Sequence, residues 1–479
     1  MSAKRRAAEY TLLLFFLLSI FNAQAQTESY QLEDTTGRGI VRIDTIVIDG
    51  NRRTKPQVIL REITFAAGDT IAFDELMEKM EVSRNHLMNI GLFNEVILNI
   101  KSWEEESIIV SVSVKERWYT FPVPALDLYD RNLNVWLVDH NASLNYLQFG
   151  LRFYQQNMRG RDEDLKLVAL FGYSQLYQVQ YFIPYINKKQ NIGLKFTTSF
   201  GRTRNLTYGF YNNKDLIYEN VEAFQKTNFY TLADVIYKPA FNYRYIFSLS
   251  YNDNQVEDTI AELNPDYFLN GATRQQYFTA RAIFVRDFKD IASYPLTGNY
   301  LELSMTKIGF GWFDNVNIFS MTGVFDQYFH LGKKWYASTQ NKLKVSFPGV
   351  QPYNLERGLG YSNDYVHGYE YYVIDGQSFG FTRWDIKNEI FKIKIKTPPK
   401  NPFLKGAKIP FSLYGRAFVS AGYVKDDYYY ENNPLNNAFL TGGGLGLDLT
   451  LIYDTTIRVE YSINKLGERG FFLHMNSIF

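Results

Sequence analysis

Short runs in which apolar and polar residues alternate recur through residues 119–479, and they constrain the fold more than any other feature. The clearest runs are 245–251, 301–305, 445–451 and 459–463, and residues 471–479 repeat the pattern up to the final Phe479. Alternation with a period of two places one apolar face and one mixed face on a β-strand. Such strands occur both in soluble sheets with one solvated face and in barrels that cross a membrane.

The composition favours the barrel. Tyr (37) and Phe (38) are abundant and aromatic residues make up 17% of the chain, which is typical of the aromatic girdles of a membrane barrel. The mean hydropathy of −0.26 does not oppose this reading, because only every second residue of a barrel strand faces lipid. Beyond the N-terminal segment, no apolar run is long enough for a membrane helix.

The N-terminus predicts export. A basic segment at 4–6 precedes an apolar stretch at 12–21, and a small-x-small cleavage site follows at 23–25. We therefore expect residues 1–25 to be a signal peptide, followed by a short segment at 26–40. The alternative is a short membrane anchor, although the apolar stretch is too short to span a bilayer.

Composition and motifs argue against disulfides, metal sites, nucleic-acid binding and enzymatic activity. The chain has no Cys and a net charge of +1, so we expect no disulfides, no thiolate-bound metal and no nucleic-acid partner. None of the five His residues lies in a metal-binding spacing and no G-x-S-x-G motif is evident. The glycine cluster 442–446 suits a strand bend or a close backbone approach. We expect no metal, no cofactor and no enzymatic activity.

Residues 41–118 read as a separate α/β module. A strand with Val41 and Ile43 ends in a turn at 49–51, and Pro56 suits a first helical turn. A second helix from about Asp74 has apolar residues spaced by three and four, and Gly91 follows it. Alternating strands then cover 96–100 and 110–114. The predicted order is strand, helix, helix, strand, strand.

This module resembles a polypeptide-transport-associated (POTRA) domain. The resemblance is carried by Ile46-Val47-Ile48-Asp49-Gly50-Asn51, by Gly91-Leu92-Phe93 and by the closing valine strand. It implies binding of partly folded chains or partner proteins by strand addition. An unrelated small α/β domain is the alternative.

Three motifs in residues 119–479 extend the resemblance. Asn157-Met158-Arg159-Gly160-Arg161-Asp162-Glu163 and Pro295-Leu296-Thr297-Gly298-Asn299-Tyr300 suit tight turns, and Val366-His367-Gly368-Tyr369 lies in a segment rich in Tyr, Asn and Gly. In this order behind a POTRA-like module, they resemble the bacterial surface antigen family, the BamA/TamA type of outer-membrane assembly factor. The resemblance implies a mainly β chain with a transmembrane antiparallel barrel of about 16 strands over residues 119–479.

The resemblance also implies a location and partners. The barrel would lie in the outer membrane of a Gram-negative bacterium, with the single POTRA domain at 41–118 in the periplasm. The implied activity is insertion or translocation of unfolded outer-membrane or secreted client proteins, and periplasmic or lipoprotein accessory subunits are further possible partners besides the lipid bilayer. A dedicated two-partner-type secretion channel and a passive porin are the alternatives.

The loop motif departs from the family pattern. The family has Arg where this chain has His367. It also has a strand motif Phe-x-Asp-x-Gly, which is matched here by Phe418, Ser420 and Gly422, so Ser420 stands where the family has Asp. Loss of one charge alone would leave the other buried and unpaired, whereas a neutral His can share a hydrogen bond with Ser. We expect an uncharged lock between His367 and Ser420, and a further lumen contact from Glu389. A solvated His367 and an ordinary inward-facing Glu389 are the alternatives.

The first and last barrel strands suggest a seam. Pro122 and Pro124 are two residues apart, so the donors that they lack fall on one lateral side of the predicted first strand. If that side faces the last strand, from Phe471 to Phe479, the closure is short of hydrogen bonds. A Pro-rich linker is the alternative. The resemblance further implies that Phe479 belongs to the signal by which such barrels are themselves assembled.

Overall fold

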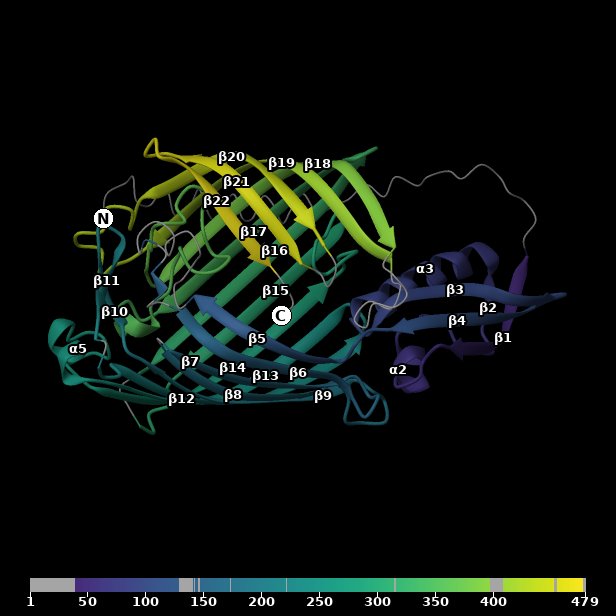
Figure 1. Cartoon of the computed structure of the whole chain (residues 1–479), viewed down its shortest axis with the longest axis horizontal. Helices are drawn as coiled ribbons and strands as arrows, with labels where there is room; N and C mark the ends of the chain where they lie inside the picture. Colours follow the sequence, from purple (N-terminus) through teal and green to yellow (C-terminus); the bar gives the residue numbers. More distant parts are fainter. Residues whose placement is uncertain are drawn as a thin grey trace.

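A small α/β module lies at one end of a large rolled β-sheet in the computed structural model of the chain (Figure 1). The structure describes residues 39–128, 141, 143, 144, 147–172, 174–220, 222–313, 316–396, 408–451 and 455–476. The predicted signal peptide and Phe479 therefore lie outside the described residues. No helix in these ranges is long and apolar enough to cross a membrane.

The module contains four strands and two helices in a fixed order. They are β1 (Ile40–Asp49), α2 (Pro56–Arg61), β2 (Thr70–Ala72), α3 (Phe73–Asn89), β3 (Phe93–Glu104) and β4 (Ser107–Glu116). The sheet order is β2-β1-β4-β3, with β1 and β4 parallel. The predicted order of elements is present, with the addition of the three-residue β2 between the helices. Strands β2 and β3 are the edges of this sheet.

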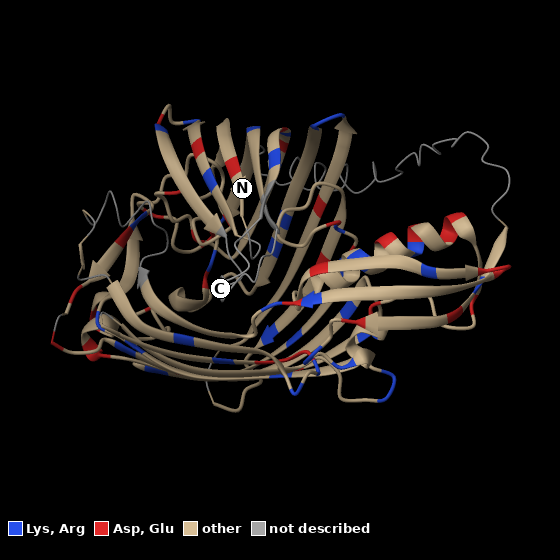
Figure 2. Ribbon diagram, turned by 45° about the vertical axis from the view of Figure 1, so that its right-hand side comes forward, with Lys and Arg blue, Asp and Glu red and all other residues tan. Residues whose placement is uncertain are grey.

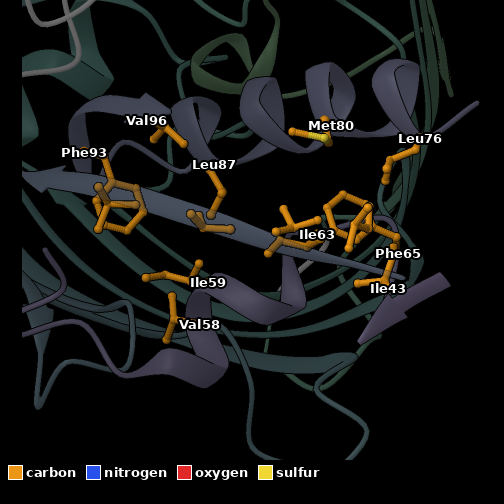
Figure 3. Packing of buried hydrophobic residues seen from close by; sticks show 14 of the residues in the cluster. Ile43, Val58, Ile59, Ile63, Phe65, Leu76, Met80, Leu87, Phe93 and Val96 are labelled. Carbon is orange, nitrogen blue, oxygen red and sulfur yellow. The ribbon is translucent and has the colours of Figure 1, made fainter. Parts of the chain in front are cut away.

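The module has a hydrophobic core of its own. Helix α3 buries Leu76, Met80 and Leu87 against the sheet, as the spacing of three and four predicts (Figure 3). A bulge in β1 after Ile43 shifts the register of its pairing with β4, so Ile46 and Ile48, and not Val47, pack on the core beyond it. Charged residues of both signs lie along the outer surface of α3 (Figure 2).

Sixteen antiparallel strands form the rolled sheet, which confirms the predicted fold. They are β5 (Thr120–Leu128), β6 (Leu147–Met158), β7 (Glu163–Gly172), β8 (Ser174–Ile183), β9 (Ile192–Thr203), β12 (Lys226–Ala240), β13 (Tyr243–Val256), β14 (Arg274–Asp287), β15 (Gly298–Ile308), β16 (Ile318–Gly332), β17 (Trp335–Phe347), β18 (Ser378–Lys396), β19 (Lys408–Lys425), β20 (Phe439–Thr450), β21 (Thr456–Asn464) and β22 (Arg469–Asn476).

The strand order runs from β22 to β5, and each strand pairs with the next strand of this sheet along the chain. Both end strands lie on the side of the roll nearer the viewer in Figure 1. Within the described residues, β5 pairs only with β6, and β22 pairs only with β21. The roll therefore has two free edges in the part of the chain that is described.

Alternation along the strands separates an apolar outer face from a polar inner face. On β20 the side chains of Leu445 and Leu447 are exposed by 66% and 49%, whereas Asp448 is fully buried. On β13 Phe247 and Leu249 are exposed and Ser250 is buried. An apolar outer face and a polar lumen are what a barrel in lipid requires.

Loops pack over the end of the roll that is remote from the module. The hairpin β10 (Leu206–Tyr211) and β11 (Lys214–Tyr218), helix α5 (Asp258–Leu263) and the short helix η2 (Tyr353–Leu355) share one hydrophobic cluster. Asn213 in the hairpin turn donates a hydrogen bond to Asn436 Oδ1 over 2.7 Å. We refer to these elements as the cap.

The module is fastened to the sheet at the β6–β7 turn, which carries the first of the predicted turn motifs. Asn157 Nδ2 donates to Thr54 Oγ1 over 2.9 Å, and Lys55 N–H donates to Gly160 O over 2.9 Å. Arg61 forms an ion pair with Asp162, also over 2.9 Å. Because Thr54 and Asn157 are both buried, this contact, which we call the clasp, is a packed interface.

Gly160 is required by the geometry of the clasp. Its φ is +68°, and a Cβ atom on it would lie 2.0 Å from the carbonyl oxygen of Arg53. Any side chain would therefore push the module away from the turn. A second contact, in which the rings of His86 and Phe241 stack with centroids 3.9 Å apart, joins α3 to the β12–β13 turn.

We predict that Gly160→Ala loosens the module from the barrel. The matched control is Gly311→Ala, because Gly311 has a φ of +79° and no atom within 4 Å of an added Cβ. Both variants carry the left-handed strain of about 1–2 kcal/mol, and only Gly160→Ala adds the clash. The chain has no Cys, so spin labels at Met77→Cys and Lys189→Cys report the separation. A broader distance distribution is expected for Gly160→Ala alone, and equal distributions would contradict the clasp.

Candidate functional site

The loop at residues 348–377, between β17 and β18, enters the roll and packs on the inner face of the last five strands. We call it the lumen loop. Its motif residues Val366, His367 and Tyr369 are all at most 3% exposed. Val366 and Tyr369 belong to a hydrophobic cluster that also contains Phe379 of β18 and Val424 of β19. The loop is thus part of the barrel interior and not a solvated surface segment.

His367 and Ser420 are in direct contact. The imidazole Nδ1 of His367 lies 3.0 Å from Ser420 Oγ, and the backbone N–H of His367 donates to the same oxygen over 3.0 Å. Ser420 Oγ also lies 3.3 Å from Gly442 O. The ring of Phe418 packs on the imidazole with a centroid separation of 4.1 Å. Both residues of the proposed lock therefore face each other across the loop–β19 contact.

The imidazole of His367 is neutral. Burial, together with the guanidinium groups of Arg383 and Arg416, holds the pKa of His367 well below its ordinary value. The contact of its Nε2 with Glu460 Oε2, at 3.6 Å, is therefore not an ion pair, and it is too long for a hydrogen bond. The bond to Ser420 is an uncharged one.

Glycines on the strands let the loop backbone approach closely. A Cβ on Gly442 would lie 1.8 Å from His367 O, and one on Gly422 would lie 2.6 Å from Val366 Cγ2. Gly442 opens the glycine cluster, and its position confirms the close backbone approach expected there. Gly368 itself has a φ of +84° and accepts a hydrogen bond from Asn464 Nδ2 over 2.8 Å.

The interpretation of Glu389 as a loop contact needs correction. Within the described residues, no hydrogen bond or ion pair joins its side chain to the loop, and its backbone N–H donates to Lys334 O in the β16–β17 turn. The register of β18 and β19 places Arg383 opposite Ser420, whereas Glu389 lies opposite Tyr414. Arg383 is the strand residue that holds the loop, since its Nε donates to Tyr365 O over 3.0 Å.

A buried ion network beside the lock was missed by sequence reasoning. Arg416, on the same face of β19 as Ser420, donates to Asp385 Oδ1 over 2.7 Å and to Glu460 Oε1. Its Nε lies 3.6 Å from Asp448. The available signal was the set of charged residues at inward positions of β18–β21. The positive charge beside the lock is thus carried by a strand residue, Arg416, and not by His367 of the loop.

One group of side chains in the network could hold a metal ion. Single ligand atoms of Glu370, Glu460 and His474 all lie within 4.8 Å of one another. They come from the lumen loop, β21 and β22. No sequence motif indicates this group, because the three residues are far apart in the chain.

Three of the four predicted seam residues lie on the two end strands, and the fourth, Phe479, lies outside the described residues. Pro122 and Pro124 are in β5 with exposed side chains, and Phe471 is in β22 and 72% exposed. The ladder between β5 and β6 continues without a shift through both prolines. This continuity requires the donors at the alternate positions to face β6, so Pro122 and Pro124 face the free edge.

Comparison with known proteins gives the module its family. Residues 41–117 match the POTRA model, described as a surface antigen variable number repeat. These residues form a POTRA domain. A curated relative, the outer membrane protein assembly factor BamA of Neorickettsia risticii (strain Illinois), is 37% identical over 76 residues. That match covers 16% of this chain and 10% of the relative. The resemblance of residues 41–117 to a POTRA domain is confirmed.

Similar solved structures include BamA from Haemophilus ducreyi lacking POTRA domains 1–3, with a TM-score of 0.49 and 14% identity, covering 91% of this chain and 84% of that chain. CdiB from Escherichia coli has a TM-score of 0.48 and 11% identity, covering 99% of this chain and 98% of that chain.

We predict that Ser420→Ala releases the loop motif. The change leaves the backbone N–H and Nδ1 of His367 without their shared partner, at a cost of about 1–3 kcal/mol. Hydrogen exchange of the amides at 365–369, followed by mass spectrometry, should then accelerate by roughly tenfold to a hundredfold. Ser199→Ala makes the same change on the inner face of β9 and should leave this exchange unaltered. An unchanged exchange rate in Ser420→Ala would contradict the hypothesis that His367 and Ser420 hold the loop in place.

We predict that Arg416→Ala destabilises the barrel strongly. It leaves the buried carboxylates of Asp385 and Glu460 without their cation, which costs about 3–5 kcal/mol. The control Arg281→Ala removes a side chain that is 43% exposed and lies 3.8 Å from Glu302, and it should cost less than about 1 kcal/mol. Urea unfolding in detergent micelles measures both. Equal losses in the two variants would show that the network contributes little.

Proposed function

We propose that this protein is an outer-membrane assembly or translocation factor. Its POTRA domain would receive unfolded client polypeptides in the periplasm, and the barrel would insert or pass them through the seam between β5 and β22. The observation that carries this proposal is the POTRA domain clasped to one mouth of a barrel whose first and last strands have free edges. A receptor and a gate on one chain suit a protein that handles other chains.

The POTRA sheet offers edges for client binding. Strands β2 and β3 each pair on one side only within the described residues. An extended peptide can add to such an edge through main-chain hydrogen bonds that do not depend on its sequence. Because the clasp holds the module at the mouth of the barrel, a peptide bound there is already close to the lumen and to β5.

The seam is weakened on the β5 side. Pro122 and Pro124 supply no donors toward the free edge, so a β22 partner could form fewer hydrogen bonds there than along a normal ladder. On the other side, Phe471 and Met475 of β22 are exposed by 72% and 69%. A client strand that pairs with β22 would extend an apolar outer face already suited to lipid.

A passive porin fits these features less well. The lumen loop fills the inner face of β18–β22, with His367 and Glu370 at most 3% exposed. The cap packs across the remote end, and its cluster includes Tyr267 and Tyr353. A diffusion pore needs an unobstructed lumen and gains nothing from a clasped POTRA domain.

A dedicated secretion channel is the second candidate, and one observation favours it. A cavity of about 920 Å³ lies between the cap, the lumen loop and the inner face of strands β6, β8, β9 and β12–β14. Its lining includes Arg202, Lys226, Asn254 and Tyr277. A polar, partly aromatic path of this kind suits an extended polypeptide that crosses the lumen instead of leaving sideways.

We predict that cross-linking the seam abolishes client insertion. Leu126→Cys on the outer face of β5 is combined in turn with Phe471→Cys and with Met475→Cys on β22, in a chain that has no native Cys. Proteoliposomes holding the oxidised protein should fail to accelerate the insertion of an unfolded client barrel. Addition of a reductant should restore the acceleration.

The matched control is a disulfide between Tyr461→Cys and Phe471→Cys, which lie directly opposite each other in the β21–β22 ladder. It cross-links β22 without spanning the seam, so insertion should persist. Transport of a secreted client that is indifferent to the seam cross-link would instead favour the secretion channel. A stable open conductance without any effect on clients would favour the porin.

A further inference from the structure

Three acid and imidazole side chains from separate elements converge in the lumen. His474 Nε2 of β22 lies 3.8 Å from Glu370 Oε1 of the lumen loop and 3.9 Å from Glu460 Oε2 of β21. His367 Nε2 lies 3.6 Å from the same Glu460 oxygen. Glu370 and Glu460 are at most 3% exposed. Glu370, Glu460 and His474 thus face a common point at distances too long for hydrogen bonds between them, and His367 lies beside Glu460.

Two of the atoms that face this point lack partners in the described structure. Glu460 Oε2 and His474 Nε2 are buried and accept or donate no hydrogen bond. The other carboxylate oxygen of Glu460, Oε1, is the one held by Arg416 and approached by Arg458. The guanidinium groups therefore occupy one side of Glu460 and leave Oε2 aimed into the group. A buried carboxylate oxygen without a partner is costly, at about 1–3 kcal/mol or more.

We propose that Glu370, Glu460 and His474 form a binding site for one divalent transition-metal ion of the zinc class. One imidazole nitrogen and two carboxylates are a ligand set that such ions accept. Ligand atoms of a tetrahedral site lie about 3.4 Å apart for bonds of about 2.1 Å. The three ligand atoms here lie within 4.8 Å of one another, so small side-chain shifts close the site around an ion. A water molecule supplies the fourth ligand.

The surrounding charges permit a divalent ion but limit its affinity. Arg416 pairs with Asp385, and Arg458 lies 3.2 Å from Asp448, so these two cations have counter-charges outside the site. Glu460 is shared between Arg416 and the ion, so its carboxylate balances the ion only in part. Arg383 binds carbonyl oxygens of the loop and adds one positive charge nearby. We expect weaker binding than at a structural zinc site.

The site ties the lumen loop to the last strand. Glu370 lies three residues beyond His367, and His474 lies on the strand that forms one side of the free edge. A bound ion would therefore stiffen β22 and keep the loop seated. This consequence for the seam rests on the proposed function, whereas the metal site itself does not.

Metal binding by the purified full-length protein tests the site. The protein in detergent is stripped with EDTA, dialysed against Zn²⁺, and analysed for metal per chain by mass spectrometry. We expect one Zn²⁺ per chain, with affinity at least tenfold lower in Glu370→Gln and in His474→Gln. The control His330→Gln removes an exposed histidine from β16 and should retain the ion. Heat-dependent gel mobility verifies that each variant is folded.

Cobalt gives a second readout of the ligands. Co²⁺ in a site of four or five ligands absorbs in the visible range, and this absorption should change in His474→Gln and stay the same in His330→Gln. The proposal is overturned if the native protein takes up no Zn²⁺ or Co²⁺, or if both site variants bind as well as the control. Because no client enters these measurements, a negative result leaves the proposed assembly function standing.

Discussion

Pairing of backbone hydrogen bonds along the sheet is the constraint on which the rest of this structure depends. In lipid no water is available for an open strand edge, so each strand of a spanning sheet must find a neighbour on both sides. Sequential pairing meets this requirement everywhere except at β5 and β22. The same pairing fixes which residues face inward, and it thereby delivers Arg383, Arg416 and Glu460 to one wall of the lumen.

The buried polar groups on that wall need hydrogen-bond partners, and the lumen loop supplies some of them. The network is arranged so that its fixed charges stay on the strands, as in the pairing of Arg416 with Asp385 and Glu460. The loop contributes a neutral His367. Withdrawing a neutral imidazole from Ser420 leaves no uncompensated charge behind, whereas withdrawing an arginine from an aspartate would cost several kcal/mol. A loop held by a neutral His and a Ser is therefore easier to displace than one held by a buried ion pair would be.

The sequence was most informative where a single period or motif decides the structure. Alternation predicted that residues 119–479 form strands, and spacing of three and four predicted α3, whereas the number of about 16 strands was implied by the family resemblance. The short β2, the hairpin β10–β11 and α5 were missed because they lie in connections without a clear period. Glu389 was assigned wrongly, because the register of β18 and β19 places Arg383 opposite Ser420 and Glu389 about 20 Å further along. No local pattern could reveal His474, whose partners lie on a loop and another strand.

The two fastenings hold opposite ends of the sheet. The clasp joins the POTRA domain to the β6–β7 turn, next to β5, while the lumen loop holds β18–β22 through Ser420, Gly442 and Asn464. The clasp thus stabilises the part of the barrel next to the free edge of β5, and the lumen loop stabilises the part next to the free edge of β22. The POTRA domain also contacts the β12–β13 turn through His86 and Phe241, whereas within the described residues the loop contacts lie on β18–β22. Neither contact joins β5 to β22. If the barrel opens sideways, we therefore expect it to open between these two strands.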